Sequence, residues 1–319
     1  MTYPLCRSLA LWSLAAALAS GQETPPANRV AWLALLPEPL PDGHNRLSLE
    51  ITTQFLRSDR ERNEARGTFA RLDGEEWQLT ADLAWDLGPA TLCLRLRGVD
   101  RSGGMLDQLI LSWHGLLSTP GGGRDDVPKY RMAYRLEKDG RVVAELTRPA
   151  RQLLDTDVAL VRTRETPWGG YRLGASVQLP TGDERAFGGN GALDTLVGAT
   201  VWRKAGHWTF HGQAELLHMG LAVDSPYRAV TGRRTLTRAW AGAGWQGSGS
   251  GFWSGFGLDV TVAAMQSPYD LGLPRVDRTG WQQHWTVTHR RLPRWTFGFS
   301  EEAGTYVSPD ITGYVRWRY

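Results

Sequence analysis

The chain has 319 residues, 41% of them hydrophobic, which is enough for one large β domain or two smaller ones. Its 36 Lys and Arg and 33 Asp and Glu give a formal net charge of +3, which excludes the strongly basic footprint of a nucleic-acid-binding protein. A mean hydropathy of -0.35 excludes a bundle of membrane helices. It does not exclude a transmembrane β-barrel, whose polar interior offsets its apolar exterior.

The first 21 residues have the three parts of a secretory signal peptide. Arg7 supplies the positive charge, Leu9 to Ala19 form an apolar core, and small residues place the cleavage site near Ala19 to Gly21. The apolar core is too short to span a bilayer as a helix. We therefore expect an exported protein, and a signal peptide at residues 1–21.

Residues 22–45 are rich in proline and polar residues and predict a short periplasmic lead-in. Residues 46–319 form the remaining domain. After cleavage Cys93 is the one cysteine left, so the mature chain has no intramolecular disulfide.

From Arg46 onward the chain alternates apolar and polar side chains with the two-residue period of β-strands. Trp77, Leu79, Leu83 and Trp85 share one parity. Two tryptophans eight residues apart on one face fit the spacing of the two aromatic girdles of a membrane barrel, about 20 Å apart for a tilted strand. Six aromatic residues are predicted at the membrane interfaces: Trp77, Trp85, Trp208, Trp285, Trp317 and Tyr319.

The closing stretch, residues 310–319, has the same pattern. Ile311, Val315, Trp317 and Tyr319 share one face, while the other face is polar and basic. Outer-membrane barrels close on such a strand, with an aromatic residue at the interface. An ordinary terminal strand of a soluble β-sandwich is the alternative.

Connections between the predicted strands alternate in length, as they do when periplasmic turns are tight and outer loops are long. Residues 138–141 (Lys-Asp-Gly-Arg) predict a two-residue hairpin turn. The count gives an all-β fold, a single antiparallel transmembrane barrel of about 14 strands. The short link near 149–153 breaks the rhythm and leaves 12 strands as the alternative.

One segment, 105–117, has a helical period and ends at a glycine-rich run. It predicts a short amphipathic helix in an outer loop. Such a helix either plugs the barrel or covers its rim. Its apolar positions include Met105, Leu106, Leu109, Ile110 and Trp113.

Five ordered pieces of the chain resemble a family of Gram-negative outer-membrane β-barrel proteins that is defined as a domain of unknown function. Its Pro-Thr-Gly-Asp loop also resembles one in barrels that take up aromatic compounds, whereas the usual Gly-Ser-Gly after that loop is here Gly189-Asn190-Gly191. The resemblance implies an outer-membrane barrel and supplies no catalytic residue or substrate. The pieces are Leu72–Trp77, Gly104–Ile110 with Trp113-His114, Gly121–Arg124, Leu179–Asp183 and Ser308–Thr312.

Charged side chains fall on the parity opposite to the apolar face, as expected if they face the interior, because a charge at the lipid midplane costs about 2–4 kcal/mol. The predicted pore-lining residues are Asp82, Arg95, Arg97, Arg131, Arg135, Arg172, Gln178, His211, Glu215, Asp259, His284, Glu302, Arg316 and Arg318.

This mixed charge predicts either a passive channel for small solutes or a non-conducting structural or assembly barrel closed by helix 105–117. A lipid-modifying outer-membrane enzyme is a weaker alternative. We expect no catalytic residue, no cofactor and no metal. His207 and His211 share a parity and His218 lies nearby on the other one, but histidines among Gln and Thr are ordinary pore lining, which we prefer to a metal site. The expected partners are outer-membrane lipid and lipopolysaccharide, the outer-membrane assembly machinery and small solutes, with no nucleic acid.

Overall fold

The computed structural model describes residues 38–41, 46–57, 61–106, 108, 112, 128–248, 253–302 and 311–319. These residues form one 16-stranded sheet. In chain order the strands are β1 (Leu47–Arg57), β2 (Glu61–Asn63), β3 (Thr68–Asp86), β4 (Thr91–Ser102), β5 (Ala133–Lys138), β6 (Arg141–Leu146), β7 (Ala150–Leu153), β8 (Thr156–Thr166), β9 (Gly169–Leu179), β10 (Asp194–Ala205), β11 (Trp208–His218), β12 (Thr235–Gln246), β13 (Phe256–Met265), β14 (Gly280–His289), β15 (Trp295–Glu302) and β16 (Ile311–Arg318).

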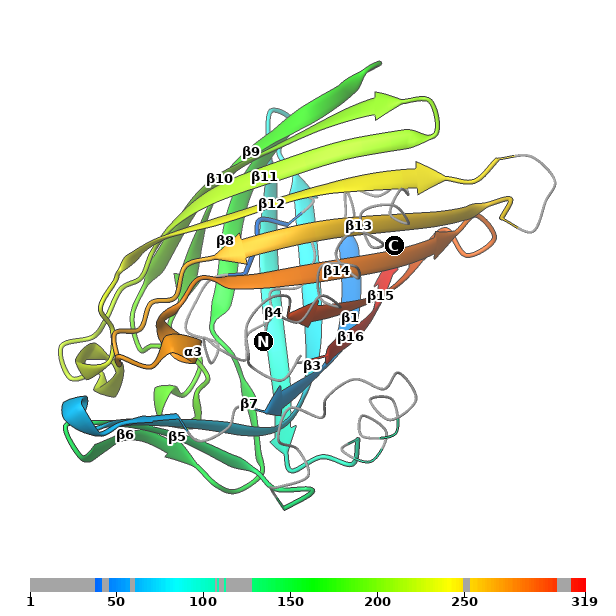
Figure 1. Cartoon of the computed structure of the whole chain (residues 1–319). Coiled ribbons are helices and arrows are strands. Elements are labelled where there is room, and N and C mark those ends of the chain that lie inside the picture. The colour runs from blue at the N-terminus through cyan, green and yellow to red at the C-terminus, as the bar shows by residue number, and fades with distance from the viewer. Residues whose placement is uncertain are drawn as a thin grey trace.

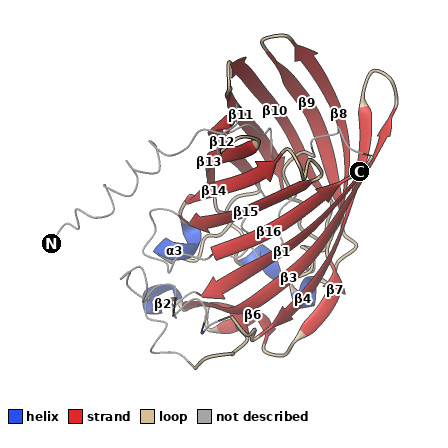
Figure 2. Cartoon of the chain, turned by 90° about the vertical axis from the view of Figure 1, so that its right-hand side faces the viewer, coloured by secondary structure: helices blue, strands red, loops and turns tan. Residues whose placement is uncertain are grey.

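Twelve of these strands close into an antiparallel barrel within the described part of the chain. From β8 to β16 each strand pairs with the next, β16 pairs with β1, and the ring is completed through β3 and β4 back to β8 (Figures 1 and 2). The barrel prediction is confirmed with 12 strands, the alternative count. The expected number of about 14 is wrong because two predicted strands lie outside the wall.

The alternation of side chains sorts the barrel wall into two surfaces. On the outward parity large apolar side chains are half exposed, including Ile51, Leu79 and Val201 at 53%, 54% and 59%. On the inward parity the neighbouring side chains are mostly buried and polar. Transmembrane barrels have this apolar outer surface and polar interior.

The hairpin β5–β6 accounts for the two extra strands. Asp139 and Gly140 both have positive φ, 52° and 71°, as a type I′ turn requires, so the predicted turn is confirmed. β5 pairs with the first third of β3, which at 19 residues extends beyond the barrel wall. The hairpin therefore lies beside the barrel end, at the lower left of Figure 1.

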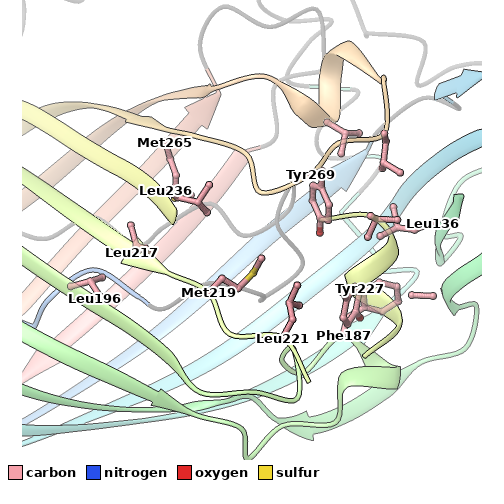
Figure 3. Close-up of a cluster of buried hydrophobic side chains, with 14 of the residues drawn as sticks. Leu136, Phe187, Leu196, Leu217, Met219, Leu221, Tyr227, Leu236, Met265 and Tyr269 are labelled. Atoms are coloured by element: carbon pink, nitrogen blue, oxygen red, sulfur yellow. The ribbon is translucent and has the colours of Figure 1, made fainter. Parts of the chain in front are cut away.

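The apolar face of this hairpin packs on protein rather than lipid. Tyr134 and Leu136 are fully buried in a cluster to which both strands and long loops contribute (Figure 3). The ring of Phe187 lies 5.9 Å from that of Tyr134 and 6.1 Å from that of Tyr227. An alternating strand has the same sequence pattern whether its apolar side contacts lipid or a protein core, which explains the miscount.

Short helical turns occur in these loops, at η1 (Glu64–Arg66), η3 (Glu184–Ala186), η4 (Pro226–Ala229) and α3 (Pro274–Asp277). No helix in the described part of the chain is long and apolar enough to cross a bilayer.

The predicted helix over 105–117 is not found in the described residues. Met105 and Leu106 are irregular, because their amides donate hydrogen bonds of 2.8 and 3.2 Å to the Glu75 carboxylate of β3. Helical backbone is described there only at the single residues Gln108 and Ser112. The other predicted positions, Leu109, Ile110 and Trp113, lie outside the described residues.

Replacing Leu136 with Ala should lower the stability of the loop core by about 2–5 kcal/mol, because a fully buried side chain leaves a cavity. The barrel strands should stay folded, since their hydrogen-bonded ring does not pass through β5. Limited proteolysis should then cut the 128–150 region faster, while the heat-modifiable mobility of the barrel persists. The control is Leu136→Met, which nearly conserves volume. Unchanged cleavage of the alanine variant would contradict this role for the core.

Candidate functional site

The candidate site is the barrel interior. Most sequence-predicted pore-lining residues lie on inward-facing strand positions there: Asp82, Arg95, Arg97, Arg172, Gln178, His211, Glu215, Asp259, His284, Arg316 and Arg318. Glu302 pairs in register with the inward residue Gln282, and nothing further is described of its side chain.

Two predicted pore-lining residues lie elsewhere. Arg131 precedes β5, and Arg135 lies on β5, outside the barrel wall. Arg135 forms ion pairs with Glu137 and Glu145 at 2.5 and 2.6 Å on the outer hairpin. Both assignments are wrong because β5 was counted as a wall strand.

One side of the interior, formed by β3, β4 and β8, carries a group of ion pairs. Arg95 donates to both oxygens of Asp82, at 2.5 and 3.1 Å, which is the two-pronged geometry that binds a carboxylate most strongly. Arg97 lies 3.2 Å from Asp157 and donates a 2.7 Å hydrogen bond to the backbone carbonyl of Asp155. Arg97 is only 2% exposed, so its charge depends on these oxygens.

A second group spans β10 to β12. The Glu215 carboxylate accepts 2.6 Å hydrogen bonds from Arg238 Nε and from Gln213 Nε2. Gln213 in turn accepts a hydrogen bond from Thr200 at 2.5 Å. Three neighbouring strands are thereby joined through side chains as well as through their backbones.

Further pairs complete the polar interior. His211 Nε2 lies 3.0 Å from Asp259, and Arg316 donates a 2.7 Å hydrogen bond to Glu50, which joins the closing strand β16 to β1. Among the described residues, no group of three His, Cys, Asp or Glu side chains could hold a metal ion. The histidines considered with His211 lie apart from it: His207 contacts Ser248, and His218 contacts Thr235.

A chain segment also passes through the interior. Residues 38–41, part of the expected periplasmic lead-in 22–45, lie inside the barrel rather than below it. Leu40 is fully buried, and its amide donates a 3.0 Å hydrogen bond to Glu215. The carbonyl of Pro39 accepts a 2.9 Å hydrogen bond from Arg95, and the Glu38 carboxylate lies 3.4 Å from the Arg97 guanidinium. Part of the interior is therefore occupied by main chain as well as by paired side chains.

This segment was missed from the sequence, although one signal for it exists. Gly174 on β9 and Gly198 on β10 occupy inward positions directly opposite each other. A glycine inside a strand often marks the close approach of another group. Here the approaching group is Leu40: a Cβ on either glycine would lie 3.0 or 3.1 Å from its Cδ1.

Five of the six predicted interface aromatics lie on outward strand positions, and the sixth, Tyr319, directly follows β16 on the same parity. Trp85, Trp208, Trp317 and Tyr319 gather at the end of the barrel that holds the C-terminus, and Trp77 lies toward the other end. Trp285 stacks on Phe299 of the neighbouring strand at 4.5 Å between centroids. The prediction missed Trp245 and Trp295, which pair in register with Trp208 and Trp317.

Asp155 lies just before β8, at the loop end of the barrel, and is fully buried. Burial raises the pKa of its carboxyl to about 6, although the Gly182 amide, at 2.8 Å, and the charge of Arg97 oppose that change. This group titrates in a physiologically accessible range.

The chain belongs to the family described as "Protein of unknown function (DUF3187)", which matches residues 50–254. No curated protein matches the chain.

Several solved structures are similar to this chain. The COG4313 outer membrane channel from Pseudomonas putida F1 is similar with a TM-score of 0.53 at 10% identity, over 93% of this chain and 100% of that one. The NanC porin has a TM-score of 0.43 at 8% identity, over 85% of this chain and 98% of that one. The transport unit of the autotransporter AIDA-I from Escherichia coli has a TM-score of 0.45 at 12% identity, over 100% of this chain and 99% of that one. The first of these similarities supports the β-barrel fold.

Replacing Glu215 with Ala should lower the free energy of unfolding by about 3–5 kcal/mol, because the buried Arg238 loses its carboxylate partner. The matched control is Glu165→Ala, which removes the exposed pair with Lys204 at 3.4 Å and should cost no more than about 1 kcal/mol. Denaturant unfolding of the refolded barrel measures both. Equal losses would show that the Glu215 pair adds nothing specific.

The raised pKa of Asp155 predicts a pH-dependent stability. The folded state binds this proton more tightly than the unfolded chain, so its contribution is fully present below about pH 4 and is lost as pH rises through about 6. The loss is at most about 3 kcal/mol. Asp155→Asn should become more stable relative to the wild type between pH 4 and pH 7. A difference that stays constant over this range would contradict the buried ionisation.

Proposed function

We propose that this DUF3187 protein is an outer-membrane channel for small solutes, whose pathway is the charged barrel interior. The observation that carries the proposal is the passage of main chain, residues 38–41, through that interior. An eight-stranded barrel has an interior that side chains fill, whereas a twelve-stranded ring is wider. Here the additional width is occupied by a strip of polypeptide, so the wall encloses space of the size that a small solute needs.

The outer membrane is the proposed location. The outward apolar belt with aromatic residues near its ends matches the surface that such barrels present to lipid, and the signal peptide, cleaved near Ala19 to Gly21, provides export. The proposed partners are membrane lipid, the assembly machinery and lipopolysaccharide. For lipopolysaccharide phosphates, Arg62 and Arg71 offer cations on the outer sheet extension, 5.4 and 5.8 Å from the Phe69 ring centroid.

The character of the interior supports transport of polar or charged solutes. Its arginines and carboxylates alternate around the wall, so both signs of charge line the route. We assign no catalytic residue. Several ionisable groups of the described interior form pairs, among them Arg95–Asp82, Glu215–Arg238 and His211–Asp259.

A structural barrel without conduction is the second candidate. Cross-strand pairs such as Glu215–Arg238, His211–Asp259 and Glu50–Arg316 join neighbouring strands inside the wall. Paired in this way, they stiffen a closed interior. Conduction distinguishes this candidate from a channel.

The refolded mature protein in a planar bilayer should produce discrete conductance steps. Arg318→Gln removes a cation from the interior at the C-terminal end of the barrel, where its guanidinium lies 3.5 Å from Thr296. The ratio of cation to anion permeability should therefore rise. The control, Arg294→Gln, removes an exposed cation at the same end, 5.3 Å from the Tyr319 ring, and should leave this ratio unchanged.

A correctly folded barrel that stays silent, both as the wild type and after residues 38–41 are displaced, would reject the channel and favour the structural role.

A further inference from the structure

Residues 38–41 lie against the inner face of the wall and contact several of its strands. At β4, Arg95 donates a 2.9 Å hydrogen bond to the Pro39 carbonyl, and Arg97 lies 3.4 Å from Glu38. At β11, the Glu215 carboxylate accepts a 3.0 Å hydrogen bond from the Leu40 amide. Between β4 and β11 the wall contains β8, β9 and β10, so the segment lies across these neighbouring strands rather than along one of them.

The wall has a hollow that fits Leu40. Gly174 and Gly198 are paired in register on β9 and β10, with Val161 next to Gly174 and Glu215 next to Gly198. The two glycines leave out the side chains that would otherwise fill this row, and Leu40 takes their place with no exposed surface. The row therefore forms a cradle of one residue's size.

The segment is also suited to an interior that lacks water. Pro39 and Pro41 have no backbone N–H, so Leu40 carries the one backbone donor of residues 39–41. That donor is the one bound by Glu215. The three residues thus leave no backbone donor unsatisfied while they occupy the cradle.

Each wall group that holds the segment has another partner in the wall. Arg95 forms an ion pair with Asp82, Arg97 with Asp157, and Glu215 with Arg238. Departure of the segment therefore leaves no buried charge without a counter-charge, and the wall is stable in both states.

The segment is attached by a short tether. Four residues separate Pro41 from Arg46 in the sequence, and the five Cα–Cα steps between them reach about 17 Å at most. Arg46 immediately precedes β1, and Leu47 binds the amide of Tyr319 at 2.8 Å, so the tether begins at the end of the barrel that holds the C-terminus. A released segment stays near that mouth and can return.

We propose that residues 38–41 are a built-in, reversible plug of the solute pathway, with Leu40 seated in the cradle of Val161, Gly174, Gly198 and Glu215. The plug rests on the proposed channel function and adds its regulation: solute passes when the segment leaves the cradle. The plug is the chain's own lead-in, not the loop segment 105–117 considered from the sequence.

Two substitutions in the full mature chain displace the plug by different means. Leu40→Asp places a carboxylate beside Glu215 and removes the apolar side chain from its hollow. Gly174→Val fills the hollow, since a Cβ alone already lies 3.0 Å from Leu40 Cδ1. Both should raise single-channel conductance several-fold. The matched control is Gly212→Val on β11, an outward position where an added Cβ meets no atom closer than 3.6 Å.

A second measurement reports the position of the segment without relying on conduction. In a Cys93→Ala background, a thiol at Leu40→Cys should react with a polar maleimide at least ten-fold more slowly than the same thiol combined with Gly174→Val. Pairing Leu40→Cys with Gly198→Cys should form a disulfide that holds conductance low until it is reduced.

The outcomes separate the plug from the channel. Equal conductance of the wild type and both displaced variants would overturn the plug and leave the channel intact. Silence of all folded variants, with the thiol at residue 40 reactive in the displaced form, would overturn the channel function and with it the gating role. Low wild-type conductance that rises on displacement and on disulfide reduction supports the plug.

Discussion

Closure of the sheet between β1 and β16 is the constraint on which the remaining structure depends. The pairing of Ile51 with Val315 joins the two ends of the barrel wall and leaves no free sheet edge in it. Because side chains alternate along every strand, closure also assigns each residue to an inner or an outer surface. The apolar exterior and the charged interior both follow from this one geometric condition.

The interior then has to satisfy its own charges. Arg95, Arg97 and Arg238 each face a carboxylate on a neighbouring strand or close to one, so these three cations have a counter-charge in the wall itself. The same set of residues therefore fulfils two roles. The pairs stabilise the wall, and their remaining hydrogen-bonding capacity binds the backbone of residues 39 and 40. A segment bound in this way adds to a stable structure and is not a part on which folding depends.

Much of the wall could be predicted from the sequence, because a strand's period is local. The alternation within ten residues of a side chain predicts whether it faces inward or outward. The structure agrees with this prediction for Trp77, Arg95, His211 and Arg316. The strand count failed at residues 133–146 for a physical reason. Tyr134 and Leu136 alternate with charged residues as lipid-facing strands do, but their apolar side meets Phe187 and its neighbours. Hydrophobic alternation records that a face avoids water and does not record what covers it.

The sequence by itself determined the β class, the inward and outward parity and the short hairpin turn, since each depends on neighbours within a few residues. Tertiary structure alone decided which strands form the ring and what fills it. Leu40 meets Glu215 across 175 residues of chain, and its hollow requires Gly174 and Gly198 on two adjacent strands. No local pattern encodes such a contact. It exists only once closure has brought β4, β9, β10 and β11 around the same interior.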